Sequence, residues 1–134
     1  MVHPRGEEAR DLLEEVSRGN LDALDEQVTD DIVWHVGGEH PLSGDYRGRE
    51  AVMDYHRRVA ELTGGSLRLD PIDVLASDRH LGIFLQASAA GGGPKLNTTM
   101  VEAIRLTEDG KWAEFWALAD DQEGVDAFWK EVAR

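Results

Sequence analysis

The chain has 134 residues, no cysteine, and 27 acidic against 14 basic side chains, a formal net charge of −13. This length suits a single domain over residues 1–134. Disulfides and thiolate chemistry are excluded, and no apolar run reaches the ~20 residues that cross a bilayer. The acidity disfavours phosphate backbones, so neither a nucleic-acid partner nor a membrane is expected. The start MVHPRGEEAR lacks an apolar signal core, which predicts a cytoplasmic protein.

Two short helices are predicted near the start. The first spans about residues 6–18 and ends at Gly19, a residue suited to a left-handed cap. Asn20 is a good N-cap for the second helix, which would extend to Val28. The apolar residues that recur at helical spacing are Ala9, Leu12, Leu13 and Val16 in the first helix, and Leu21, Leu24 and Val28 in the second.

A strand, a loop and a third helix follow. Ile32 to Val36 is rich in β-favouring residues, whereas the glycines and proline of residues 37–48 predict an irregular loop. The third helix is expected to be the longest and to end at Gly64 and Gly65. Its inner face is formed by Val52, Tyr55, His56, Val59 and Leu62.

The second half of the chain predicts antiparallel strands. The four candidates are residues 66–76, 80–89, 96–106 and 112–119, with Asp109-Gly110 as the turn between the last two. A terminal helix bears Val125, Phe128, Trp129 and Val132. The order predicts an α+β fold, in which a curved antiparallel sheet wraps over three helices.

The motifs WHV-G, PLSGDYRGREAV, DGK-AEFW and DAFW occur in this order along nearly the whole chain. In order and separation they resemble the SnoaL-like polyketide cyclase and ketosteroid isomerase branch of the nuclear-transport-factor-two-like superfamily. The resemblance implies a cone-shaped α+β barrel with an internal pocket.

The family's catalytic residues are matched only in part. Counted from shared landmarks, the general-base aspartate of ketosteroid isomerase falls on Val36 and its oxyanion tyrosine near Leu12, whereas its oxyanion acid falls on Glu102. The supporting tyrosine of the third helix corresponds to His56. The aspartate of SnoaL-type cyclases and of limonene epoxide hydrolase would lie near Ala117, and the other polar groups of that hydrolase at residues 84–87.

Glu102 interrupts an alternating row whose other members favour burial: Leu96, Thr98, Met100, Ile104 and Leu106. A carboxyl on that row would be partly desolvated, which favours its neutral form and makes it a hydrogen-bond donor for a carbonyl or enolate oxygen. The alternative is a structural glutamate, at a sheet edge or a dimer interface, that pairs with an arginine such as Arg105.

Trp34 and Val36 share one face of their strand, predicted to face the pocket, and His35 takes the other face. A shift of one residue would reverse this assignment. His35 and His56 are both candidates for moving a proton, although each can equally be a structural histidine. The predicted ligand-binding residues are Trp34, Val36, Tyr55, Met100, Trp116 and Asp120, and Trp112 is a further candidate for an apolar wall.

Other classes of site lack their sequence patterns. The five histidines include no i, i+4 helical pair with nearby carboxylates, so no metal site is expected. Ser43 with His40 and Asp45 lacks a nucleophile elbow. Residues 91–93 lack the lysine and the strand-to-helix context of a phosphate loop, so no cofactor is expected.

The leading hypothesis is a pocket protein for a small hydrophobic, oxygenated ligand of polyketide or steroid type. If it is an enzyme, it would be a cofactor-free isomerase, cyclase or dehydratase that uses Glu102 with His56 or His35. The alternative is a non-catalytic ligand-binding or dimeric accessory protein. A homodimer is expected because Phe84, Val101 and Ala103 oppose the inner apolar residues of their strands and need a cover.

Overall fold

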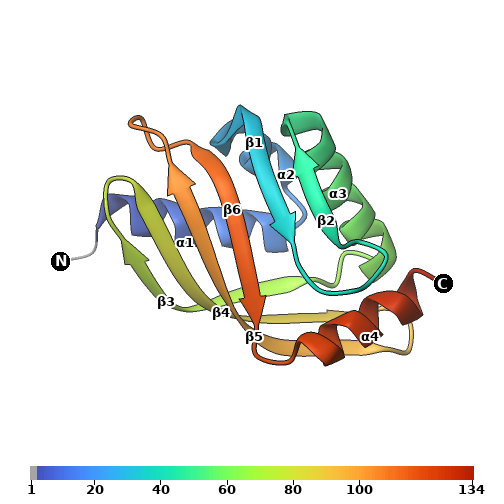
Figure 1. The fold of residues 1–134 in the computed structure, drawn as a ribbon. Coiled ribbons are helices and arrows are strands. Elements are labelled where there is room, and N and C mark those ends of the chain that lie inside the picture. Colours follow the sequence, from blue (N-terminus) through green and yellow to red (C-terminus); the bar gives the residue numbers. More distant parts are fainter. Residues whose placement is uncertain (1–2) are drawn as a thin grey trace.

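The computed structural model describes residues 3–134, which form four helices and a six-stranded sheet. The sheet is curved and unclosed, with the strand order β2-β1-β6-β5-β4-β3, and this α+β cone is the predicted fold class (Figure 1). The helices are α1 (Pro4–Ser17), α2 (Leu21–Gln27), α3 (Arg49–Thr63) and α4 (Gln122–Val132). The strands are β1 (Val28–Val36), β2 (Gly44–Arg47), β3 (Arg68–Ala76), β4 (His80–Ala90), β5 (Lys95–Leu106) and β6 (Trp112–Ala119).

The first two helices lie close to their predicted positions. Pro4 opens α1, where its missing N–H costs nothing, and Gly19 follows the helix with a φ of 87°. Asn20 stands at the N-cap of α2, but its side chain makes no capping bond and instead donates to Glu15 at 2.7 Å. The predicted extension of this helix to Val28 is wrong, because Val28 begins β1 and is already paired with Trp112 of β6.

The sheet differs from the prediction in two ways. Strand β2 forms inside the segment predicted to be a loop, because its residues pair with β1 from Val33 to Val36. Strands β1 and β6 are parallel, so the sheet is mixed and not wholly antiparallel. Strand β3, at the other edge, contains Pro71 beside a register irregularity, as expected for a proline that cannot donate to a ladder.

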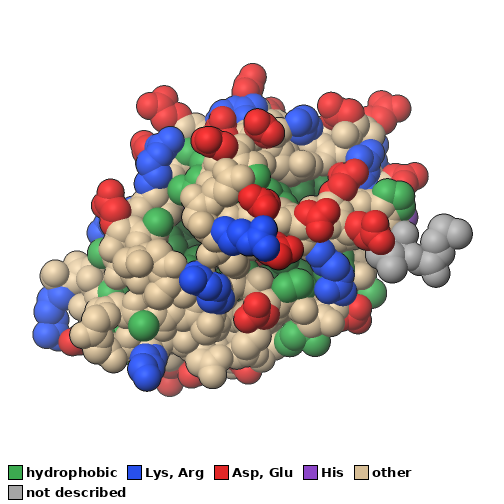
Figure 2. Space-filling model, turned by 180° about the vertical axis from the view of Figure 1, so that it is seen from behind, with side chains coloured by type: hydrophobic (Ala, Val, Ile, Leu, Met, Phe, Trp, Pro, Cys, Tyr) green, Lys and Arg blue, Asp and Glu red, His purple; other side chains and the backbone are tan. Residues whose placement is uncertain are grey.

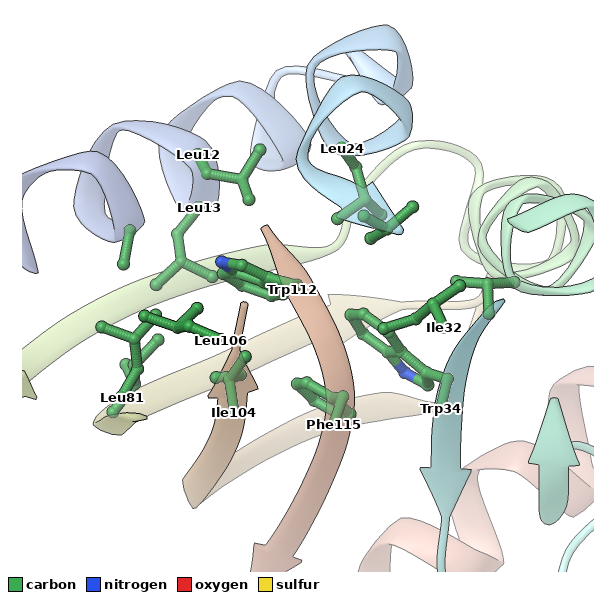
Figure 3. Packing of buried hydrophobic residues seen from close by; sticks show 14 of the residues in the cluster. Leu12, Leu13, Leu24, Ile32, Trp34, Leu81, Ile104, Leu106, Trp112 and Phe115 are labelled. Atoms are coloured by element: carbon green, nitrogen blue, oxygen red, sulfur yellow. The ribbon is translucent and has the colours of Figure 1, made fainter. Parts of the chain in front are cut away.

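Helices α1 and α3 cover the inner face of the sheet, and α4 follows β6 beside the ends of β5 and β6 (Figure 1). The main core joins α1, α2 and α3 to this face (Figure 3). Trp34 and Phe115 stack there with ring centroids 3.7 Å apart, and Trp112 lies parallel beyond them. A second apolar cluster, at the α4 end, contains Leu42, Val59, Ala89, Leu96, Val125, Phe128 and Trp129. Two separate clusters leave room for a cavity between them.

The surface reflects the excess of acidic residues. On the face turned away from the viewer in Figure 1, acidic side chains are spread over much of the area with arginines and lysines between them (Figure 2). Within residues 3–134, no helix combines the length and the apolar character that a membrane crossing requires.

Candidate functional site

A cavity of about 120 Å³ lies between the two apolar clusters. Its wall is built from strands β1, β3, β4, β5 and β6, from α1, α3 and α4, and from the segments before β3 and after β1. Trp34, Val36, Met100, Phe115 and Ala117 form much of the apolar wall on the sheet side. The polar groups on the wall are therefore the ones that can recognise or convert an occupant.

Glu102 reaches this cavity from the middle of β5. It is paired with Ile83 of β4 on one side and Ala117 of β6 on the other, and only 6% of its surface is exposed. Burial raises the pKa of its carboxyl from 4.5 to about 8, so the carboxyl is protonated at neutral pH. Arg105 pairs with Glu114 at 3.5 Å, on the outer side of the sheet. Burial is the cause of the raised pKa of Glu102 and no hydrogen bond within residues 3–134 contributes to it, so the O–H of Glu102 is available to a ligand.

His56 and Tyr55 enter the same cavity from α3. The Nδ1 of His56 lies 2.8 Å from the carbonyl oxygen of Val52, and because a carbonyl only accepts, Nδ1 carries the proton. The Nε2 atom is then left with its lone pair free. Burial lowers the pKa of His56 to about 4 and keeps the ring neutral, while the ring packs edge-on against Trp34.

Tyr55 lies beside His56 and near Glu102. Its ring packs edge-on against His56, with centroids 4.9 Å apart. Burial raises the pKa of its hydroxyl, and the nearby Tyr46 and Glu102 raise it further. Glu102, Tyr55 and His56 thus form one cluster of groups that are all neutral at pH 7.

His35 belongs to the other side of β1. Although it contributes to the cavity wall, its Nδ1 lies 2.7 Å from Asp45 and its Nε2 lies 2.7 Å from Glu114. Both ring nitrogens are therefore occupied by surface carboxylates. The hydrogen bond with Glu114 is the largest cause that raises the pKa of His35, and the hydrogen bond with Asp45 is the second. The ring stacks on Trp116, which is 40% exposed on the outer face of the sheet.

Two predicted ligand-binding residues lie away from the cavity wall. Trp116 stands on the outer face, as its contact with His35 requires. Asp120 accepts hydrogen bonds from the Thr98 hydroxyl at 2.7 Å and from the Thr99 backbone at 3.2 Å, which ties the end of β6 to β5. The six residues that the structure does bring to the wall, besides His35, are Trp34, Val36, Tyr55, His56, Met100 and Glu102.

Part of the wall was not foreseen from the sequence. His40, Gln122, Val125 and Trp129 close the cavity on the α4 side. The loop that carries His40 packs tightly against α4: a Cβ at Gly38, whose φ is 84°, would collide with the side chains of Gln122 and Asp126. Only the amphipathic pattern of α4 signalled this wall, since nothing in the spacing of the loop marks His40.

The positions matched to the family's catalytic groups differ in their surroundings. Leu12 is buried in the main core and Val36 lies at the cavity wall. Ala117, where the cyclase aspartate would stand, also lines the cavity. In the described part of the chain, no group of three or more His, Asp or Glu side chains is arranged to hold a metal ion.

The sequence matches the family described as the SnoaL-like domain over residues 9–115, so the chain belongs to this family. A search of curated protein sequences found no match.

Solved structures agree with this membership. Bal32a, from a soil-derived mobile gene cassette, superposes with a TM-score of 0.87 at 25% identity, over 93% of this chain and 95% of its own. A protein with a cystatin-like fold from Xanthomonas campestris superposes with a TM-score of 0.86 at 27% identity, over 95% of this chain and 98% of its own. IdmH, a proposed polyketide cyclase from Streptomyces antibioticus, superposes with a TM-score of 0.70 over 98% of this chain and 99% of its own. Its sequence identity is 19%, so this similarity supports the fold alone.

Proposed function

We propose that this protein converts a small, hydrophobic, oxygenated molecule by cofactor-free acid/base chemistry, as an isomerase, cyclase or dehydratase. The observation that carries the proposal is the pairing, on one cavity wall, of a protonated Glu102 with a His56 whose Nε2 is unprotonated. One is a donor and the other an acceptor of protons, and both are kept from bulk water by apolar neighbours.

The simplest reaction that this pair supports is proton transfer next to a carbonyl. The carbonyl oxygen accepts a hydrogen bond from the Glu102 O–H, while Nε2 of His56 removes the proton from the adjacent carbon. The electron pair moves into an enolate, which the Glu102 donor stabilises more strongly than the ketone because the oxygen has gained charge. The imidazolium then returns the proton to another carbon of the substrate, and no electrons or atoms are gained or lost.

The low pKa of His56 fits this role. Because burial lowers its pKa to about 4, the ring is unprotonated at pH 7 and Nε2 is able to accept a proton. The polyketide-like character of the substrate rests on family membership and on the fold shared with IdmH, a proposed polyketide cyclase. A steroid-like substrate rests on the match of Glu102 to the oxyanion acid of ketosteroid isomerase.

A second candidate function is that of a non-catalytic ligand-binding protein. It is favoured by the apolar residues Val36, Leu12 and Ala117 at the three positions where relatives are expected to carry catalytic groups. In that case Glu102 would still hydrogen-bond a ligand, but no proton would move.

Proton exchange separates the two candidates. Deuterium exchange into a panel of enolisable ketones, followed by NMR, is expected to be accelerated by the native protein and lost in His56→Leu. Glu102→Gln keeps a donor of the same size and is expected to leave ligand affinity nearly intact, whereas Glu102→Leu should cost about 1 to 3 kcal/mol of binding. His80→Leu, at an exposed position, is the matched control for the histidine change. Binding without exchange in the native protein would favour the non-catalytic candidate.

We further propose that the protein forms a homodimer through the outer face of the sheet. Phe84, Val101 and Leu118 lie side by side across β4, β5 and β6, and Phe84 and Leu118 are 41% and 74% exposed. Trp116, two residues before Leu118 on β6 and paired with Ala103 of β5, extends this apolar row along the strand. A second copy would remove these side chains from water.

A further inference from the structure

We propose that the cavity selects an uncharged ligand whose buried part is a single six-membered ring bearing a carbonyl oxygen. This inference rests on the proposed function and narrows its substrate class: a monocyclic ketone or enone is favoured over a multi-ring steroid-type nucleus and over any carboxylic acid. Three observations support it: the size of the cavity, the charge of its wall and the arrangement of its polar groups.

The volume of the cavity limits the size of the ligand. The cavity holds about 120 Å³, whereas an engineered apolar cavity of ~150 Å³ in another protein accommodates one benzene ring. A fused second ring would have to displace the walls or project out of the cavity into solvent. Those walls belong to packed clusters on both sides, with Trp34 and Phe115 stacked on one side and Val125 and Trp129 on the other. Packed interiors yield little to added volume, so a larger nucleus is excluded from the buried part.

The charge of the cavity wall limits the charge of the ligand. No lysine or arginine is among the residues that line the cavity. Burial lowers the pKa of His40 and His56, and His35, whose pKa is raised, is already bound to Asp45 and Glu114, so within residues 3–134 the wall offers no unpaired cation to an anion. The chain as a whole carries a formal net charge of −13, which repels anions at longer range. A carboxylate in this cavity would be buried without a partner, and the desolvation cost of an unpaired charge is prohibitive.

Polar complementarity gives the third limit. Glu102 and His56 both line this space of single-ring size. Glu102 can supply an O–H, and because Nδ1 of His56 is bound to the Val52 carbonyl, Nε2 is the ring atom left to accept a hydrogen bond. A ring carbonyl satisfies the first group. A weakly acidic C–H or a hydroxyl on the same ring satisfies the second. A plain hydrocarbon ring would leave the Glu102 donor unpaired, which disfavours its binding.

The test is a binding series followed by amide and side-chain NMR at pH 7. 2-Cyclohexen-1-one and acetophenone represent the single ring, 1-tetralone the fused pair, a steroid enone the large nucleus, and benzoate the charged counterpart of acetophenone. The single-ring ketones are expected to shift the resonances of Trp34 and His56, and to bind at least about tenfold more tightly than 1-tetralone and the steroid. Benzoate is expected not to bind.

Two variants locate the effect. Ala117→Leu fills the cavity and is expected to abolish binding of the single-ring ketones. Val125→Ala enlarges the cavity without a polar change and is expected to admit 1-tetralone. Ile72→Ala, at a position of edge strand β3 that is 60% exposed and outside the cavity wall, should change neither affinity and serves as the control. The gain in Val125→Ala keeps the test decisive even if Ala117→Leu fails to fold.

The outcomes separate this inference from the proposed function. Tighter, Glu102-dependent binding of the steroid or of 1-tetralone to the native protein would overturn the size limit while leaving the acid/base proposal intact. Benzoate binding as tightly as acetophenone would overturn the charge limit. If no ketone of any size binds, both the inference and the proposed function fail.

Discussion

A histidine and a glutamate lie on each side of the sheet, the inner histidine coming from α3, and the two pairs behave in opposite ways. On the inner face, burial lowers the pKa of His56 to about 4 and raises that of Glu102 to about 8, so both groups are neutral. On the outer face, His35 and Glu114 hydrogen-bond at 2.7 Å, which raises the pKa of the histidine and lowers that of the glutamate. The same two residue types stay neutral in one place and form an ion pair in the other because their access to water differs.

The largest expected effect is on the pH dependence of stability, through Glu102. Its pKa is 4.5 in the unfolded chain and about 8 in the fold, so between these values the folded state retains a proton that the unfolded state has lost. Stability therefore falls as the pH rises through this window, by ~1.4 kcal/mol per pH unit. Glu102→Gln removes this dependence. The free energy of unfolding of the variant minus that of the native protein is therefore expected to increase by several kcal/mol between pH 4.5 and pH 8.

His56 modifies the curve of the native protein. Its pKa is 6.5 unfolded and about 4 folded, so it makes stability rise with pH over that range. The two slopes cancel between about pH 4.5 and 6.5, and the loss due to Glu102 emerges between 6.5 and 8. Denaturant unfolding at half-unit pH steps measures this, and a Glu102→Gln difference that does not vary with pH would contradict the assignment.

The next largest effect is expected at the outer face. Leu118→Asp places a charge in the apolar row and should raise the dissociation constant of the proposed homodimer at least about tenfold. Sedimentation over a concentration series measures it. Ile72→Asp is the control, because Ile72 is 60% exposed but lies at the irregularity of edge strand β3. A native protein that sediments as a 14.9 kDa species at micromolar concentration would contradict the dimer.

A smaller effect is expected from His35→Gln. Because the folded pKa of His35 is raised above 6.5, its stabilising contribution is complete below pH 6.5 and is lost as the pH rises through the folded pKa. The pair is partly exposed, so the substitution should cost about 1 kcal/mol or less at pH 6 and less still at pH 9. His80→Gln is the matched exposed control. A cost that grows with pH would contradict the proposed ion pair.

The smallest effect is spectroscopic. Glu114→Gln removes the first cause of the raised pKa of His35, so the imidazole should titrate closer to 6.5, although Asp45 continues to raise its pKa. Histidine Cε1–H resonances followed by NMR report this shift. In the same spectra His56 serves as the internal reference, since it should remain neutral down to about pH 4.

The sequence predicted most of the features that depend on local patterns, such as which side chains of a strand or helix face the interior. The alternating row of β5 placed Glu102 on the buried face, and the periodicity of α3 placed His56 on its inner side. Both placements follow from repeats of two and about 3.6 residues, which the chain expresses without help from distant segments.

Features that depend on distant partners could not be predicted in this way. Strand β2 has four residues, starts at a glycine and has no buried position, so its pairing with β1 defines it and its composition does not. Val28 suits either the end of a helix or the start of a strand, and its partner Trp112 decides between them. His40 reaches the cavity only because its loop packs on α4, a contact with no local signature.

The parallel pairing of β1 with β6 also bears on how the protein matures during synthesis. The bond between His35 and Glu114 joins residues separated by 79 positions, so β1, which pairs with β2 on one side, lacks its neighbour on the other side until β6 has left the ribosome. Until then the apolar faces of α1 and α3 have no complete sheet to cover. We expect the nascent chain to stay unfolded through most of translation and to fold in one late step, after β6 has been made.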